Sequence, residues 1–458
     1  MVSKVRTFKS EKGLSQDVGT YRRGELRGVI RINEEVCVGC DTCRGVCPAD
    51  AIEGSVGEKH KINLDKCVVC GQCLINCPFD AVEQMSFVED VLPKLKDKQT
   101  KVVAIVAPAV RVAIAEEFGA KPGTLALGRL WVALKKAGFE IYDNNFAADQ
   151  TILEEGTELL ARIAAHAGLK ELPVYLWDKK LVLEVEEYKH KPLPQFTSCC
   201  PAWVRYVELY YPDLIPYLST CKSPQQMAGA TAKTYGAKDV WKVAVEKVYT
   251  VGVMPCTAKI FEAFRPEFNS AGKYHKNESI RDVDAVLTTR DLAEIFRRLN
   301  IDFMRLPEER DPKHFMWYSG GATIFGVSGG VMEAAIRFAF HVLSGKEPSP
   351  TASEWEFHDV RGLTNPVVRA TVTIPLRPEY QKVFNDKVIR LKVCVVNGIG
   401  HNGAHLKPVV KEVLRGKSPY QFIEVMTCPG GCINGGGQPK QAMSIGFIQK
   451  IFYKLGRA

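Results

Sequence analysis

The sequence lacks several features that would assign it to a common class of protein. Its 458 residues contain no apolar run close to the roughly 20 residues that a transmembrane helix needs. The N-terminal stretch MVSKVRTFKSEKG has no apolar core of the kind found in signal peptides, so we expect no transmembrane segment and no export signal on this chain. The formal net charge is +9, but the Lys and Arg residues are dispersed and form no basic stripe with interleaved aromatic residues. This distribution argues against a nucleic-acid partner.

Nucleotide-binding signatures are also missing. No Walker motif or flavin signature occurs, and the glycine-rich segment GGATIFGVSGG has neither the G-x-G-x-x-G order nor the later acidic residue of a dinucleotide-binding fold. We interpret residues 326–340 as a glycine turn that leads into a buried helix. With 46% hydrophobic and 25% charged residues, the chain is typical of a globular protein with a large core and one or two smaller domains.

Cysteine, by contrast, is abundant, with 15 residues. Eight of them form two copies of the pattern C-x2-C-x2-C-x3-C-P, in CVGCDTCRGVCP and CVVCGQCLINCP. This spacing is typical of bacterial ferredoxins with two [4Fe-4S] clusters, in which the fourth cysteine of each run binds the other cluster. A disulfide or zinc scaffold is the alternative, but two-residue gaps suit a cubane better than a tetrahedral zinc site. The predicted ligands are Cys37, Cys40, Cys43 and Cys77 for one cluster, and Cys47, Cys67, Cys70 and Cys73 for the other.

The duplicated pattern predicts a small pseudo-symmetric α+β domain. Each run would turn tightly around one cubane, while a hairpin and a short helix carry the cysteine that crosses to the other cluster. Two clusters close together conduct single electrons but perform no reaction of their own. The reaction must therefore lie in the rest of the chain.

That remainder alternates strands and helices. Short apolar, β-branched runs within residues 101–110, 246–256 and 389–400 predict strands, each of which ends in a loop with distinctive residues. Segment 140–166 predicts a helix whose apolar face carries Ile152, Leu159, Leu160 and Ile163. The pattern predicts an α/β architecture with functional loops at the strand ends.

Five of the seven remaining cysteines lie in three short strings. TSCCPAW contains Cys199 and Cys200, MPCTAKIFEA contains Cys256, and EVMTCPGGCINGGGQP contains Cys428 and Cys432. Four thiolates from distant segments would hold a third cubane, and glycines let the backbone approach inorganic sulfur closely. One of the five cysteines is then left over.

The three strings resemble the three signature segments of the [FeFe]-hydrogenases, and the resemblance extends from about Arg31 to Pro439. It implies a catalytic α/β domain with two lobes around the active site, preceded by the α+β two-cluster domain. It also implies an H-cluster, in which a [4Fe-4S] cubane is bridged by Cys432 to a two-iron subsite with CO, cyanide and an aza-dithiolate. The implied cubane ligands are Cys200, Cys256, Cys428 and Cys432.

The resemblance also implies a role for the extra cysteine. Cys199 would pass protons to the amine of the dithiolate, for which a thiol with a reference pKa of about 8.5 is suited. The implied relay to solvent consists of Glu155, Ser219, Glu158 and Arg162. The two glutamates and the arginine are spaced to share one helix face. Spacing alone favours a solvent-exposed Glu158–Arg162 ion pair, whereas the resemblance favours the relay.

Other residues are implied to shape the two-iron pocket. Lys259 would donate to one cyanide, because an ammonium is a compact point charge. Ala107, Pro108, Ser223 and Gln225 would contact the other cyanide, and Met254 and Met426 would pack against the iron site, although a methionine is more often plain core filling.

Three further residues lie near these strings or outside the pattern. Thr427 stands beside a ligand where many relatives have alanine, and its hydroxyl would raise the cluster potential by donating a hydrogen bond to sulfur. Cys221 and Cys394 match no ligand position and are interpreted as small buried hydrophobic residues.

The expected domains are an N-terminal extension over residues 1–29, the ferredoxin-like domain over 30–90 and the catalytic domain over 91–458. Segment 168–191 is longer than in close relatives, and its alternating LVLEVEE predicts an added strand or hairpin. The chain ends soon after GGGQP, where single-chain relatives continue, so we expect a separate small subunit.

Other implied partners are maturation factors and an external electron carrier, either a ferredoxin or a c-type cytochrome. Co-export with the small subunit would place the protein in the periplasm, which we favour slightly over the cytoplasm.

The resemblance implies reversible oxidation of H2 with protons as co-substrate. Two alternatives are an H2 sensor, which more often lacks the extra cysteine and carries a signalling domain, and an iron–sulfur assembly protein of similar fold. The assembly protein would lack the pocket residues around Lys259 and Gln225. Since Cys199 and both of these residues are present, we expect an enzyme.

Overall fold

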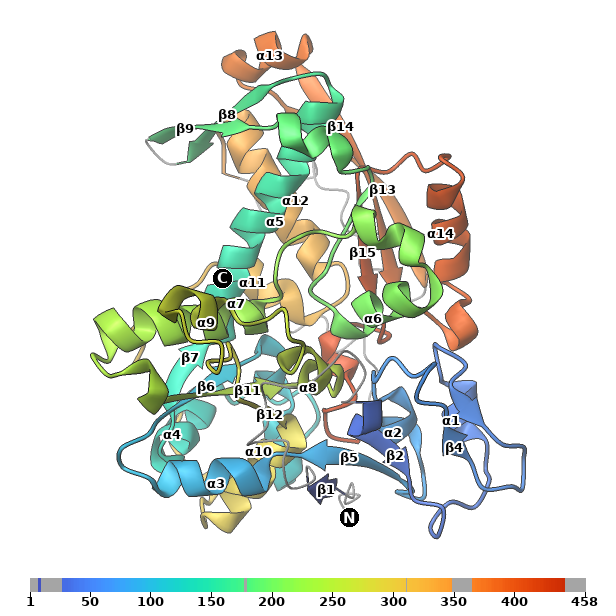
Figure 1. The fold of residues 1–458 in the computed structure, drawn as a ribbon, viewed down its shortest axis with the longest axis vertical. Helices are drawn as coiled ribbons and strands as arrows, with labels where there is room; N and C mark the ends of the chain where they lie inside the picture. Colours follow the sequence, from blue (N-terminus) through green and yellow to red (C-terminus); the bar gives the residue numbers. More distant parts are fainter. Residues whose placement is uncertain (1–6, 10–26, 177–178, 310, 348–364, 441–458) are drawn as a thin grey trace.

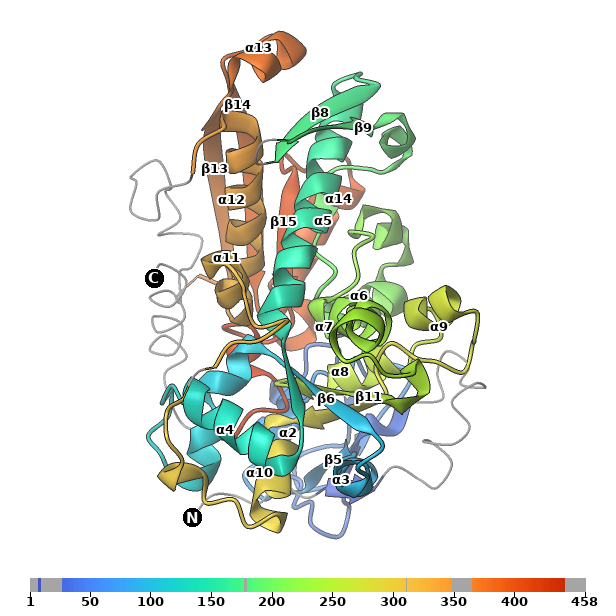
Figure 2. The same ribbon diagram turned by 90° about the vertical axis from the view of Figure 1, so that its left-hand side faces the viewer.

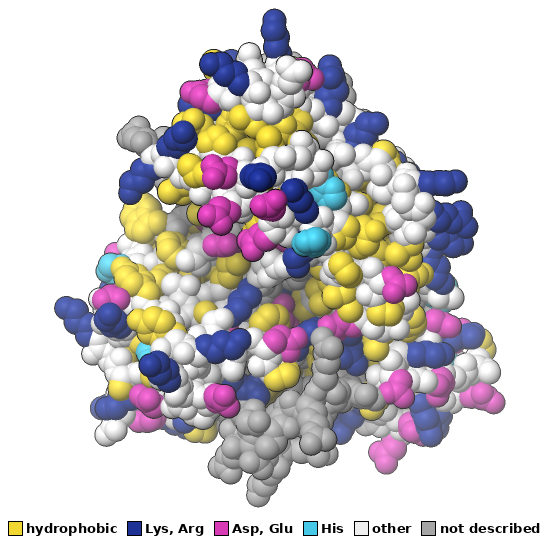
Figure 3. Space-filling model, turned by 45° about the horizontal axis from the view of Figure 1, so that its top comes forward, with side chains coloured by type: hydrophobic (Ala, Val, Ile, Leu, Met, Phe, Trp, Pro, Cys, Tyr) yellow, Lys and Arg dark blue, Asp and Glu magenta, His cyan; other side chains and the backbone are white. Residues whose placement is uncertain are grey.

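The computed structural model describes residues 7–9, 27–176, 179–309, 311–347 and 365–440. They form a ferredoxin-like unit and two lobes, each built around a four-stranded sheet (Figure 1). No helix in these ranges is both long and apolar enough to cross a bilayer. On the face drawn in Figure 3, Lys and Arg side chains are scattered among Asp and Glu and do not gather into a stripe. The predicted architecture, an α/β protein with an α+β unit at its N-terminal end, is confirmed.

The ferredoxin-like unit follows the duplication in the sequence. Each cysteine run turns into a short helix directly after a residue with left-handed backbone, Asp41 (φ 66°) in the first run and Gly71 (φ 75°) in the second. The predicted hairpin is present, beside a three-stranded sheet of order β1-β5-β2. The elements are β1 Thr7–Lys9, β2 Ile30–Ile32, α1 Thr42–Gly45, β3 Ile52–Glu53, β4 Lys61–Ile62, α2 Gln72–Asn76 and β5 Val82–Ser86.

The first lobe has a fully parallel sheet of order β12-β11-β6-β7. Its central strands are buried along almost their whole length, which explains why they read as continuous apolar runs. The strands are β6 Lys101–Val106, β7 Glu140–Asp143, β11 Val248–Met254 and β12 Ala285–Thr288, and the helices are α3 Val88–Lys96, α4 Leu127–Ala137, α7 Pro224–Thr231, α8 Ala258–Ala263, α9 Ser270–His275 and α10 Thr289–Arg298. A π-helical segment, η6 Ala232–Val240, continues α7.

The second lobe has a mixed sheet of order β10-β15-β14-β13, in which only β13 is antiparallel to its neighbour. The long helices α5 and α12 run side by side along it in both views (Figures 1 and 2). The strands are β10 Gln195–Phe196, β13 Val367–Pro375, β14 Val388–Asn397 and β15 Phe422–Met426, and the helices are α5 Asn144–His166, α6 Pro201–Tyr210, α11 Gly320–Thr323, α12 Gly330–Ser344, α13 Pro378–Phe384 and α14 Leu406–Leu414.

Several local predictions are confirmed here. The glycine turn before α12 is present, with Gly329 at φ 82°, and α12 is buried along most of its length. The predicted face of α5 packs in the core of this lobe. The extra segment after α5 forms an antiparallel hairpin of β8 Glu171–Leu176 and β9 Lys179–Glu184. The last part of the expected catalytic domain, residues 441–458, lies outside the described residues.

The described residues also form short 3-10 helices between these elements. They are η1 Arg27–Val29, η2 Pro108–Val112, η3 Ile114–Phe118, η4 Glu186–His190, η5 Pro212–Tyr217, η7 Val245–Lys247, η8 Phe303–Arg305, η9 Ile324–Gly326, η10 His401–Gly403 and η11 Cys432–Asn434.

Candidate active site

A cavity lies where strands of both lobes end. Its wall includes Ala107 to Ala109 after β6, Met254 to Cys256 at the end of β11, and Met426 to Cys428 at the end of β15. Cys199, Cys200 and Pro201 follow the short strand β10. Ligand sites at the carboxyl ends of strands are the general rule for open α/β sheets. The cavity measures about 70 Å³, several times the 10–15 Å³ or so that one water needs on this measure, so it can hold a multi-atom group.

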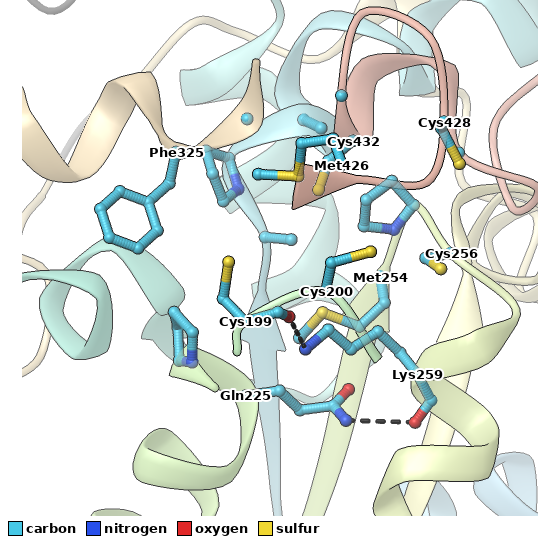
Figure 4. A pocket seen from close by; sticks show the side chains of 18 of the residues that line it. Cys199, Cys200, Gln225, Met254, Cys256, Lys259, Phe325, Met426, Cys428 and Cys432 are labelled. Carbon is cyan, nitrogen blue, oxygen red and sulfur yellow. Dashed lines mark hydrogen bonds between the residues drawn. The ribbon is translucent and has the colours of Figure 1, made fainter. Parts of the chain in front are cut away.

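Five cysteines line this cavity, as the three strings predict. In Figure 4 the sulfur of Cys200 points towards the side on which Cys256 and Cys428 lie, whereas the sulfur of Cys199 points away from them. Burial, followed by the charges of the neighbouring Cys200 and Cys256 thiols, raises the pKa of Cys432 to about 12. The thiols of Cys200, Cys256, Cys428 and Cys432 therefore adjoin one another, and the Cys199 thiol, although near two of them, has a different orientation.

The two predicted ferredoxin-type ligand sets also converge. Cys77, Cys37 and Cys40 lie close enough to Cys43 that their charges add to the burial that raises its pKa to about 11. In the second set, burial raises the pKa of Cys73 well above its usual value, and the charges of Cys70, Cys67 and Cys47 raise it further. The crossing of Cys47 and Cys77 between the two runs is thus present in the fold. All fifteen cysteines are free.

The second ferredoxin-type set lies directly beside the cavity. The charges of Cys256 and Cys70 both contribute to the raised pKa of Cys428, after burial itself. The backbone makes this approach possible, because a Cβ at Gly436 would lie 2.5 Å from the carbonyl oxygen of Cys70 and one at Gly71 2.7 Å from the Cα of Gly436. The glycine-rich turn after Cys432 therefore brings the two thiol groups together.

Lys259 lies at the start of α8 and reaches the cavity wall. Its Nζ donates to the backbone carbonyl of Cys199 (3.1 Å) and to both carboxylate oxygens of Glu262 (3.0 and 2.9 Å). Burial on its own would lower the pKa of Lys259, but the charge and hydrogen bond of Glu262 leave it above its usual value. The side chain is therefore a permanent cation at the cavity.

Glu262 also holds two side chains of the α7 N-terminus. It accepts from Ser223 Oγ (2.8 Å) and from Gln225 Nε2 (3.1 Å). Gln225 lines the cavity, and its Oε1 has no hydrogen-bond partner among the described residues. Ser223 does not line the cavity, so its predicted contact with a cyanide is not supported; its hydroxyl is directed to Glu262 instead. The other predicted pocket residues, Ala107, Pro108, Met254 and Met426, all line the cavity.

Behind Cys199, the predicted relay residues come together on α5 and the 217–221 loop. Glu155 is 1% exposed and Glu158 is 4% exposed. Burial, followed by the charge of Glu158, raises the pKa of Glu155 to about 8, although the Ser219 hydroxyl and the Ser198 N–H lower it. Ser219 Oγ donates to Glu158 Oε2 at 2.9 Å. The Glu155 carboxyl, the Ser219 hydroxyl and the Glu158 carboxylate thus lie next to one another behind Cys199.

The Cys199 thiol is a weaker acid than its reference value suggests. Burial raises the pKa of Cys199 well above its usual range, and the nearby Glu155 carboxyl raises it further. The Cys199 thiol therefore holds its proton at neutral pH.

The Glu158–Arg162 pair exists, but not on the surface. Arg162 is fully buried, and its Nη2 donates to Glu158 Oε1 at 2.5 Å. The solvent-exposed pair that spacing alone favours is therefore wrong. Spacing could not distinguish the two, because the loops that cover this face of α5 come from residues 192 and 217–218.

Three further expectations have different outcomes. Cys394 is fully buried on β14, as predicted. Cys221 is only half-buried, and its Sγ lies 4.0 Å from Glu158 Oε2, so it is not a simple core residue. Thr427 Oγ1 lies 3.4 Å from Cys200 Sγ, which places the predicted hydroxyl beside a predicted ligand sulfur.

Sequence reasoning missed two residues of the site. Glu262 holds Lys259 and Gln225 together, and its position three residues after Lys259 on a helix was an available signal. Phe325 lines the cavity from the 3-10 turn η9 before α12. No sequence signal distinguishes this phenylalanine from an ordinary core residue.

Comparisons with known proteins agree with this geometry. The family model of the iron only hydrogenase large subunit, C-terminal domain, matches residues 100–436, and a 4Fe-4S dicluster domain matches residues 29–89. The periplasmic [Fe] hydrogenase large subunit of Nitratidesulfovibrio vulgaris is 46% identical over 413 residues, which are 90% of this chain and 86% of that protein. Iron hydrogenase 1 of Clostridium pasteurianum is 39% identical over 78% of this chain and 53% of that protein.

Solved structures give the same result. An [FeFe]-hydrogenase from Chlamydomonas reinhardtii superimposes with a TM-score of 0.64 and 33% sequence identity, over 80% of this chain and 88% of that chain. The sequence motifs, the grouping of the thiols and the overall fold therefore agree, and the chain belongs to the [FeFe]-hydrogenase family.

Proposed function

We propose that this chain is the catalytic subunit of an [FeFe]-hydrogenase that interconverts H2 with protons and electrons. The observation that carries the proposal is the division among the five cavity cysteines: four thiols form one group, while Cys199 faces elsewhere and adjoins a buried path of acidic groups. An iron–sulfur assembly protein, which moves no protons to a reaction centre, has no need of such a path.

The residues fit the cofactors of this family, two [4Fe-4S] clusters and the H-cluster. The two convergent ferredoxin-type thiol sets and the thiols at the cavity are the ligands that [4Fe-4S] clusters take. Cys200, Cys256, Cys428 and Cys432 would hold the cubane of the H-cluster. The bound H-cluster supplies the iron at which H2 is split or formed.

The protein's own groups would then perform three tasks. The Lys259 ammonium, held by Glu262, would donate to a cyanide, and Gln225, held by the same carboxylate, would form the neighbouring part of the pocket wall. Met254 and Met426 exclude water from the cavity wall, which strengthens each of these polar contacts. Cys199, Glu155, Ser219 and Glu158 would move protons between the cavity and the outer part of α5.

Electrons would leave through the second ferredoxin-type set, which adjoins the cavity at Cys70. The first set includes Cys40, which is exposed to solvent, so an external carrier would exchange electrons there. A ferredoxin or a c-type cytochrome remains our proposal for that carrier. We also propose a separate small subunit, supported by the relative that is named as a large subunit.

Infrared spectroscopy of the matured protein tests this function directly. The matured chain should show stretching bands of CO and cyanide and should both consume and evolve H2. The same chain purified without maturation factors is the control and should show neither the bands nor the activity. Absence of these bands after maturation, with the cubane iron in place, would overturn the proposal.

Thr427 gives a second measurable expectation. As a ligand, Cys200 is a thiolate, so the Thr427 hydroxyl at 3.4 Å donates to it and stabilises the reduced, more negative cluster. One hydrogen bond is worth about 0.5–1.5 kcal/mol, so Thr427→Val should lower the cubane midpoint potential by about 20–60 mV. Redox titration followed by electron paramagnetic resonance measures this shift. Thr427→Ser retains the hydroxyl and should leave the potential unchanged; an equal shift in both variants would refute the role of the hydrogen bond.

A further inference from the structure

Arg162 lies at the outer end of the relay residues, but it cannot pass protons to or from solvent. This side chain is fully buried, and every nitrogen of its guanidinium donates to the protein. Nε and Nη2 donate to Glu158 Oε1 (3.1 and 2.5 Å), Nη1 donates to the carbonyls of Pro192 and Tyr217, and Nη2 donates to the carbonyl of Leu218. A guanidinium remains protonated in proteins and has no acceptor atom. Arg162 can therefore hold Glu158 in place but cannot accept a proton from solvent.

The other oxygen of Glu158 leads in a different direction. Glu158 Oε2 accepts from Ser219 Oγ (2.9 Å), from the Thr220 backbone N–H (2.9 Å) and from Thr220 Oγ1 (3.1 Å). Ser219 is buried and lies on the side of Glu155, whereas Thr220 is exposed to solvent. Since Glu158 itself is only 4% exposed, the Thr220 hydroxyl connects its carboxylate to solvent.

Cys221 is the other side chain that could link Glu158 to solvent. Its half-buried thiol lies 4.0 Å from Glu158 Oε2, at the limit of a sulfur hydrogen bond, and a thiol is a weak donor and a weak acceptor. A hydroxyl both donates and accepts well, so it can receive one proton while it releases another. The distances and the chemistry both favour Thr220.

We propose that the Thr220 hydroxyl is the solvent end of the proton relay and that Arg162 is a positioning residue outside the path. This inference rests on the proposed function. During inward transfer, the O–H bond of Thr220 breaks as its proton moves to Glu158 Oε2, and the hydroxyl oxygen takes a proton from a hydronium ion, which becomes water. During H2 oxidation the same exchange runs outwards.

The test compares three variants of the full-length protein in an infrared pH-jump experiment, and a fourth variant assigns the reporting band. The band that reports protonation of the Glu158 carboxyl is assigned with Glu158→Gln. Thr220→Val keeps the backbone hydrogen bond but lacks the hydroxyl, and it should slow this protonation at least tenfold. Thr220→Ser restores the hydroxyl and should be as fast as the original protein. Cys221→Ala, the neighbouring control, should also be as fast. The H2 turnover of the matured variants should follow the same order.

Three results would overturn the inference: unchanged protonation in Thr220→Val, equal slowing in Thr220→Val and Thr220→Ser, or slowing in Cys221→Ala alone. The second result would mean that the threonine acts through packing. The pH-jump experiment does not need the two-iron subsite. A protein that protonates Glu158 as described but never turns over H2 would therefore contradict the proposed function and not this inference.

Discussion

Replacing Cys199 with serine is expected to lower H2 turnover by about two to four orders of magnitude, while the iron content stays that of the original protein. The thiol lines the cavity beside the buried Glu155, and its sulfur points away from the thiols of the cubane set. Serine is nearly the same size, so the pocket is preserved. A hydroxyl is a far weaker acid than a thiol, and burial makes its ionisation harder still. Proton transfer at the cavity should therefore nearly stop.

The adjacent residue provides a matched control. Cys200→Ser makes the same change one position along the chain, at a thiol that points towards Cys256 and Cys428. This variant should lose the cubane iron and with it all activity. Iron determination, the visible absorption of the clusters and H2 turnover separate the two cases. If Cys199→Ser loses iron to the same extent as Cys200→Ser, the two cysteines share one role and the division of labour is wrong.

The ferredoxin-like unit and the cubane ligands could be predicted because their signals are local. Cysteines at two-residue gaps must turn around a common centre, and the structure places Cys37, Cys40, Cys43 and Cys77 together as expected. The hairpin β8–β9 could also be predicted, because apolar and polar residues alternate in LVLEVEE, as they do in a strand.

What could not be predicted depends on contacts between distant segments. Helical spacing placed Glu158 and Arg162 together but could not show that the loops at Pro192 and Leu218 would cover them. The resemblance placed Ser223 at the cavity, but the sequence could not show that its hydroxyl donates to Glu262. The exposure of Thr220 beside a buried carboxylate has no sequence signal at all.

Glu155→Gln should lower H2 turnover and raise the stability of the fold at high pH. The carboxyl is buried, and its Oε1 has no hydrogen-bond partner among the described residues. Its pKa of about 8 means that it carries a proton at neutral pH, which it can pass between Ser219 and Cys199. The amide of glutamine has almost the same shape but no transferable acid proton. Turnover should therefore fall at least about a hundredfold, the lower end of the range for a general acid.

The second effect is on stability: at high pH the glutamine variant should be more stable than the original protein. Burial raises the pKa of Glu155 from 4.5 to about 8 in the folded protein, so between these values the folded state keeps a proton that the unfolded state releases. The free energy of unfolding therefore falls as the pH rises through this window, and it does so less in the glutamine variant. Thermal unfolding at pH 4, 7 and 9 should show near-equal midpoints at the lowest pH and a more stable variant at the highest.

The same substitution at Glu154 supplies the control, because that neighbouring side chain is exposed. Glu154→Gln should change neither turnover nor the pH dependence of unfolding by a comparable amount. A pH-independent difference in stability for Glu155→Gln would show that its carboxyl is already ionised in the fold, and the relay would then lack its acid. A buried acid that lowers stability above neutral pH and yet is required for turnover is placed for proton transfer and not for packing.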